Sequence, residues 1–233
     1  PFNDPGRDEA WGWLGLPICA GLFVIISFRV APEFYHWWVA REGPGILETA
    51  QFLLMVMGFA IAVQLLLDPF VPARPLVLAV TILAGFTCLY VGGEEVGWGQ
   101  HIFFWAEPEL TTAVNPEGEL GLHTINPAFE QVPRQILVFG VLIGGLIVPL
   151  VARVYPSLRT SRIALFLPAA VMFPTAACVA FFKLWEVLSK QGLIGEFGKR
   201  PSETIEVYLY FFVFAYLVVF ERRISQIEAE ARR

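Results

Sequence analysis

Six long apolar runs constrain this chain more than any other feature of its sequence. They cover residues 13–30, 46–67, 76–97, 136–154, 163–188 and 204–220. A helix needs about 20 mostly apolar residues to cross a bilayer. Charged residues make up only 16% of the chain, against about 25% in soluble domains. The sequence therefore predicts one all-α, polytopic integral membrane domain: a helical bundle of about six transmembrane helices in the lipid bilayer.

Other classes of protein fit the sequence poorly. A transmembrane β-barrel shows segments of about ten residues with alternating hydrophobicity, whereas these runs are continuous. The net charge of −5 gives no case for a nucleic-acid partner. Cys19, Cys88 and Cys178 each lie inside an apolar run without metal-type spacing, so they are interpreted as small buried residues. Pro168 and Pro174 predict kinks in the fifth span.

The distribution of Lys and Arg predicts the orientation of the bundle, because short cytoplasmic loops are enriched in these residues. Arg153, Arg159 and Arg162 lie around the connection between the fourth and fifth spans, and the tail 221–233 holds four arginines. Six spans then place both termini in the cytoplasm and make this tail a cytoplasmic helical extension. The extramembrane loop 106–133, which has five glutamates and no Lys or Arg, faces outward.

The third span ends in an unusually polar stretch, YVGGEEVGWGQHIFFW at residues 90–105. If the helix continues through it, Glu94, Trp98 and His101 share one helix face, and Glu95 lies about 100° away around the axis. The glycines of this stretch are small enough to let another helix or a ligand approach. Carboxylates within a membrane usually face a bundle interior, a water-filled cavity or a partner, so the stretch is a candidate functional site.

GEEVGWGQHIF and the following GELGLHTIN resemble a family of bacterial integral membrane proteins of unassigned function. Its members carry a GEEISWGQRIF-like span end, an ETNLHN-like loop and a REDGxxEW-like segment, in place of which this chain has REGPGILE. The sequence departs from that pattern at His101, Gly121 and Thr124. The resemblance implies a bacterial inner-membrane protein and names these site candidates: Arg41, Glu42, Glu48, Glu94, Glu95, Trp98, Gly99, Gln100, Glu119, Leu122 and His123.

Three kinds of chemistry remain open for these residues. Glu94 and Glu95 with His101 and His123 are ligand types that a divalent metal such as zinc accepts, although their spacing fits no established signature. A partly buried carboxylate could instead perform acid–base chemistry on a lipid-linked substrate. The acids and Gln100 could also only hold the 106–133 loop against the bundle. A histidine can ligate the magnesium of a pigment, but nothing in the sequence singles out a chlorophyll.

Two functional classes follow from this pattern. One is a protein with an outward-facing Glu/His/Gln site, because the ionisable residues at the span ends gather in one leaflet. The alternative is a non-catalytic accessory subunit packed against other membrane subunits of a larger respiratory or photosynthetic complex. In the first class, at least one of Glu94 and Glu95 points into the bundle, toward Glu48, Glu186 or Glu206. The 106–133 loop then folds back over the end of the third span.

Overall fold

The computed structural model describes residues 7–41, 45–103 and 128–232. It is 85% helical and contains no strand within these residues. Six helical segments are long and apolar enough to cross a membrane. This confirms the predicted all-α bundle, and the chain is a multi-pass membrane protein.

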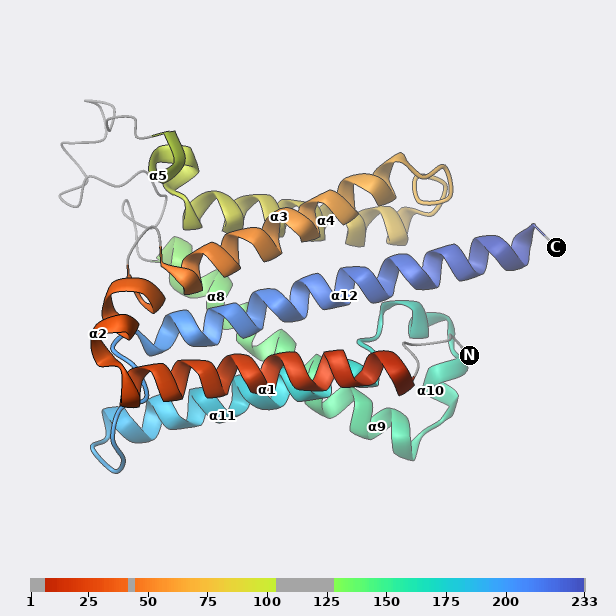
Figure 1. The fold of residues 1–233 in the computed structure, drawn as a ribbon. Coiled ribbons are helices and arrows are strands. Elements are labelled where there is room, and N and C mark those ends of the chain that lie inside the picture. The colour runs from red at the N-terminus through yellow and green to blue at the C-terminus, as the bar shows by residue number, and fades with distance from the viewer. Residues whose placement is uncertain (1–6, 42–44, 104–127, 233) are drawn as a thin grey trace.

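The six spans follow one another along the chain and run alternately up and down (Figure 1). The first three are single helices: α1 (Arg7–Val30), α3 (Ile46–Leu67) and α4 (Pro75–Glu95). The fourth consists of α8 (Ala128–Leu142), η3 (Ile143–Ile147) and α9 (Val148–Val154). The fifth consists of η4 (Arg162–Phe166), η5 (Ala170–Met172) and α11 (Phe173–Lys190), and the sixth is α12 (Pro201–Ala231).

Short helical segments connect these spans. The turn after α1 contains α2 (Pro32–Phe34) and the π-helix η1 (Tyr35–Val39). The chain after α4 forms η2 (Gly97–Gly99) and α5 (Gln100–Phe103). The segment α10 (Ser157–Thr160) follows α9. Prolines 75, 174 and 201 stand in the first turns of α4, α11 and α12, where a missing N–H costs no hydrogen bond.

Helix α12 is the central element of the bundle. Of its most apolar window, 67% is buried inside the protein, against at most 39% for the other five spans. Figure 1 shows α12 running between the α3–α4 pair on one side and α1 with α11 on the other. Leu209, Ala215 and Leu217 are fully buried along it. The buried polar side chains of α12 therefore face neighbouring helices rather than lipid.

One end of the bundle holds four of the five charged side chains that are buried among the described residues, namely Glu48, Glu186, Glu203 and Glu206. We call it the acidic end: α1, α4 and α11 end there, and α3 and α12 begin there (Figure 1). The start of α1 and the end of α12 lie at the opposite end (Figure 1). Glu48, Glu203 and Glu206 are buried within the first turns of α3 and α12. Helix α12 thus places acids in the interior of the acidic end.

The fourth span begins earlier than predicted. Residues 128–133 were expected in the extramembrane loop, but they form the first turns of α8, and Pro133 lies within that helix. A proline so near a helix start removes few intrahelical hydrogen bonds. The consequence is that Arg134 sits on a helix that faces α12. Residues 106–127 of the predicted loop lie outside the described residues.

The fifth span is broken rather than kinked. Leu167 and Ala169 on either side of Pro168 are extended, with ψ of 137° and 151°. Pro174 starts α11 instead of bending it. The buried Arg223 of α12 donates hydrogen bonds to the carbonyls of Ala164 and Leu167 at 2.8 and 2.5 Å. Such a partner is needed because a carbonyl without one is costly at membrane depth.

The cysteine prediction holds only in part. Cys88 is buried and Cys178 half-buried, but Cys19 is exposed on α1. Large apolar side chains such as Leu83, Phe86 and Leu184 are also exposed on the spans. An outward apolar surface is what a helix presents to lipid, so an exposed cysteine on it still lies in an apolar environment.

Candidate functional site

Helix α4 stops at Glu95 instead of continuing through the polar stretch. Gly97, Trp98 and Gly99 have φ of 52°, 51° and 98°. Trp98 is the one non-glycine residue with positive φ among the residues that the structure describes. This left-handed turn is what the two flanking glycines permit. The predicted common helix face of Glu94, Trp98 and His101 is therefore wrong, because the helix ends before Trp98.

Glu94 and Trp98 nevertheless meet through this turn. The Trp98 indole Nε1 donates a hydrogen bond of 2.6 Å to Glu94 Oε1. The indole ring lies over Gly93, where an added Cβ would come within 2.9 Å of it. Glu94 is thus held at the surface of the acidic end beside an indole that is 43% exposed.

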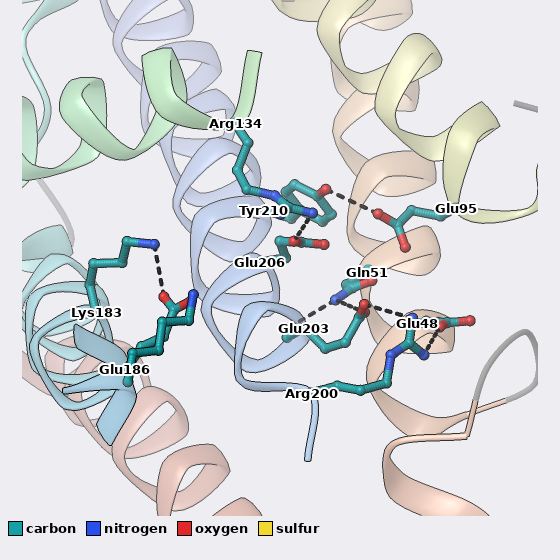
Figure 2. A network of polar contacts seen from close by, with 11 residues as sticks. Glu48, Gln51, Glu95, Arg134, Lys183, Glu186, Arg200, Glu203, Glu206 and Tyr210 are labelled. Atoms are coloured by element: carbon teal, nitrogen blue, oxygen red, sulfur yellow. Dashed lines mark hydrogen bonds and ion pairs between the residues drawn. The ribbon is translucent and has the colours of Figure 1, made fainter. Parts of the chain in front are cut away.

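Glu95 points the other way, into the bundle. Its Oε1 accepts a hydrogen bond of 3.0 Å from the hydroxyl of Tyr210 on α12. Figure 2 shows its carboxylate directed from α4 toward α12, on the same side as Glu206. The prediction that one of the two acids points inward toward a neighbouring acid therefore fits Glu95. Glu186 lies on a different side of α12 in Figure 2.

Two arginines hold three further acids at this end. Arg134 Nη2 on α8 lies 2.5 Å from Glu206 Oε1. Arg200, just before α12, bridges two helices because its guanidinium lies 2.6 Å from Glu48 on α3 and 3.0 Å from Glu203 on α12. Buried ion pairs of this kind need good geometry to offset the loss of hydration. Together with Glu95 and Tyr210, these residues form what we call the polar cluster (Figure 2).

Gln51 completes the polar cluster and leaves one atom unsatisfied. Its Nε2 donates to the Glu203 backbone carbonyl at 2.9 Å and to Glu203 Oε2 at 3.1 Å. The residue is 0% exposed, and its Oε1 has no hydrogen-bond donor in the structure. In Figure 2 its side chain lies between the carboxylates of Glu203 and Glu95. A buried acceptor without a donor costs about 1–3 kcal/mol, so this atom marks a place where a donor is missing.

Tyr35 approaches the polar cluster from η1. Burial, and next the charge of Glu203, raise the pKa of Tyr35 to about 12, while Arg200 acts in the opposite direction. Its hydroxyl lies against the backbone of Gly198, where an added Cβ would collide with it. The connection from α11 to α12 is thus packed against η1, which fixes Arg200 beside Glu48 and Glu203.

A separate charged group lies on α11. Lys183 and Lys190 bind Glu186 at 2.8 and 2.6 Å. Lys183 stands three residues before Glu186 and Lys190 four residues after it, and side chains at these spacings meet on one face of a helix. Within the described part of the chain, no hydrogen bond or ion pair joins this group to the polar cluster.

Some of the other predicted site residues lie in the described part of the chain, and the rest lie outside it. Arg41 is exposed, Gln100 is half-buried, and Glu48 belongs to the polar cluster. Glu42, Glu119 and His123 lie outside the described residues, as does the side chain of His101. Within the described part, no group of three or more His, Cys, Asp or Glu residues could hold a metal ion. The predicted set of Glu94, Glu95, His101 and His123 depends on two histidines that this part does not include.

Sequence reasoning missed Gln51, Arg134, Arg200 and Tyr210 as site residues. One signal could have found Tyr210: it stands seven residues after Glu203 and four after Glu206, which places it on the same face of α12 as these two acids. Gln51 likewise follows Glu48 by three residues on α3. No spacing in the sequence pairs Arg134 or Arg200 with these faces, because both belong to other segments.

The fold and the polar cluster define a six-span helical membrane protein with a buried charged network at one end of the bundle. Comparison with known proteins adds no relative: no family model, curated protein or solved structure matches this chain.

Proposed function

We propose that this protein binds a polar ligand at the outward-facing acidic end of its bundle, in the inner membrane of a bacterium, with both termini in the cytoplasm. The membrane location of the spans follows from their apolar length. The orientation rests on the arginines near the connection between the fourth and fifth spans, opposite the acidic end.

One observation carries the proposal of a site: the polar cluster comes from four helical segments and contains a fully buried acceptor, Gln51 Oε1, without a donor. Glu48 and Gln51 come from α3, Glu95 from α4, Arg134 from α8 and Tyr210 from α12. Polar groups at this depth are costly, and a purely structural network is expected to satisfy its own members. Gln51 Oε1 is not satisfied, which favours a ligand over a purely structural role.

The turn after α4 supports the same proposal. A non-glycine residue with φ of 51° costs of order 1–3 kcal/mol, and such residues cluster at functional sites. The turn gives the two acids different partners, because Glu94 accepts from Trp98 whereas Glu95 accepts from Tyr210 on α12. The chemistry available is binding, or proton transfer by a carboxylate, to a soluble or lipid-linked molecule.

Gentle purification from the native membrane tests this function. Small molecules extracted from the purified protein are identified by mass spectrometry, and co-purifying proteins are identified in the same sample. The proposal expects a small molecule bound in near-stoichiometric amount to the wild type and lost from Glu95→Gln. Glu33→Gln is the control, because Glu33 is an exposed acid on α2 at the same end. Other membrane subunits without a small molecule would instead favour the accessory-subunit alternative.

A further inference from the structure

We propose that the polar cluster binds a primary ammonium group, with Glu95 as the carboxylate that takes its charge and Gln51 Oε1 as a second acceptor. This inference rests on the proposed function of the acidic end as a ligand site, and it names the chemical class of the ligand. The same group occurs in free amines and in lipid headgroups.

The first argument is the balance of charge in the polar cluster. It contains four carboxylates, Glu48, Glu95, Glu203 and Glu206, and two guanidinium groups, Arg134 and Arg200. Arg134 binds Glu206, while Arg200 binds Glu48 and Glu203. Glu95 has a neutral partner, the Tyr210 hydroxyl, and no Lys or Arg among the described residues forms an ion pair with it. Crowded acids of this kind need a further positive charge or a shared proton.

The rest of the chain offers little to supply that charge. Residues 42–44 and 104–127, whose structure is not described, contain no Lys or Arg at all. The exposed Arg41 is near α3 in sequence, and Lys183 and Lys190 are bound to Glu186. A cationic ligand would supply Glu95 with the positive charge that no described Lys or Arg gives it through an ion pair.

The second argument is the unsatisfied acceptor, which is independent of the charge. Gln51 is fully buried, its amide nitrogen is committed to Glu203, and its Oε1 lacks a donor. A primary ammonium carries three N–H donors. It can therefore satisfy Gln51 Oε1 and a carboxylate at the same time. A quaternary ammonium carries the same charge but no donor, so it cannot satisfy this amide.

A metal ion fits the described residues less well than an ammonium group. Metal sites need several ligands at fixed short distances, and no group of three acidic, His or Cys side chains in the described ranges meets that need. An ammonium needs only two or three acceptors. Glu95 and Gln51 each offer one such acceptor.

Two matched ligands test the inference. The purified protein in a non-ionic detergent is titrated with ethanolamine and, separately, with choline, and the melting temperature and the heat of binding are measured. To distinguish the sources of the ammonium, the protein is also placed in nanodiscs of phosphatidylethanolamine or of phosphatidylcholine, each mixed with phosphatidylglycerol. The inference expects stabilisation by ethanolamine over choline if the ligand is soluble. It expects stabilisation by phosphatidylethanolamine over phosphatidylcholine if the ligand is a lipid.

Variants show whether the polar cluster is responsible. Glu95→Gln and Gln51→Leu should each weaken amine binding by about tenfold or more, the size expected for one hydrogen bond to a charged group. Glu33→Gln should leave it unchanged. Equal responses to the two amines and to the two lipids in wild type would overturn the inference. If a different small molecule co-purifies and is lost from Glu95→Gln, the proposed function stands and only the ammonium inference fails. If nothing binds, both fail.

Discussion

The Tyr210 hydroxyl donates a hydrogen bond of 3.0 Å to the Glu95 carboxylate, across a separation of 115 residues in the sequence. This contact joins the end of α4 to the central helix α12. It also turns Glu95 away from Glu94, its neighbour in the chain, which instead accepts from Trp98. The acidic end thus has one half-buried carboxylate held by Trp98 and another that is directed toward α12.

The Tyr210–Glu95 contact should have a measurable coupling energy. Tyr210→Phe and Glu95→Leu should each destabilise the protein by about 1–3 kcal/mol, because each removes one group of this hydrogen bond and leaves the other polar group without its partner. The double variant should lose less than the sum of the two single losses. Equilibrium unfolding in a mixed detergent measures all three. Strictly additive losses would show that the two groups do not interact.

Removing one partner of the Arg134–Glu206 pair should lower the unfolding free energy of the protein far more than removing both partners. Glu206 is buried, so Arg134→Met removes an ion-pair partner from a buried carboxylate and should cost about 3–5 kcal/mol. Replacing both residues by Met should recover most of that loss.

Arg232 and Glu228, 4.0 Å apart with the arginine 82% exposed, provide the control for this measurement. Removing either of these side chains should change the unfolding free energy by less than about 1 kcal/mol. A loss from Arg134→Met as small as that from Arg232→Met would contradict burial of the Glu206 pair.

The turn at residues 97–99 should require its glycines. Gly99 has φ of 98°, so Gly99→Ala should cost at least about 1 kcal/mol and should weaken ligand binding by displacing Glu95. Gly140 on α8 has open space around it, so Gly140→Ala should instead be neutral or stabilising by about 0.5–1 kcal/mol. Thermal unfolding of the two variants compares them directly. Equal effects would mean that the left-handed turn does not constrain the site.

Arg223 should be required for the broken fifth span. Arg223→Leu should cost about 2–4 kcal/mol, because it removes the donors from at least two carbonyls near Pro168. Arg159 on α10 is exposed, so Arg159→Leu should change stability by less than about 0.5 kcal/mol. Unfolding measured in the same detergent compares the two. A harmless Arg223→Leu would show that these carbonyls find other partners.

The orientation can be measured by cysteine accessibility. In a chain without its three native cysteines, Ser157→Cys on α10 should react only from the cytoplasmic side, because the arginines lie there. Leu193→Cys, which is 67% exposed between α11 and α12, should react from the outside. A membrane-impermeant maleimide on intact cells and on inverted vesicles distinguishes the two. The opposite pattern would place the acidic end in the cytoplasm.

Hydropathy predicted the six spans because lipid demands long apolar helices, whatever their neighbours. It also singled out Glu48 and Glu95, since acids are costly there. It did not find Arg200 or Gln51, whose contacts with Glu48 and Glu203 span 152 residues. Nor did it find Arg134, because this residue lies between the predicted loop and the predicted fourth span, whereas in the structure it lies within α8. The glycines around Trp98 were interpreted as small packing residues, so the helix end at Glu95 was missed.

Native mass spectrometry of the intact protein tests the central claim, that the polar cluster is a ligand site, most directly. Glu95→Gln and Glu186→Gln each neutralise an acid at the acidic end, but Glu186 lies on α11 and is bound by two lysines. The account predicts a discrete bound mass on wild type and on Glu186→Gln, and its loss from Glu95→Gln with the six-helix fold retained by circular dichroism. An unchanged bound mass on Glu95→Gln, or no bound mass on wild type, would contradict it.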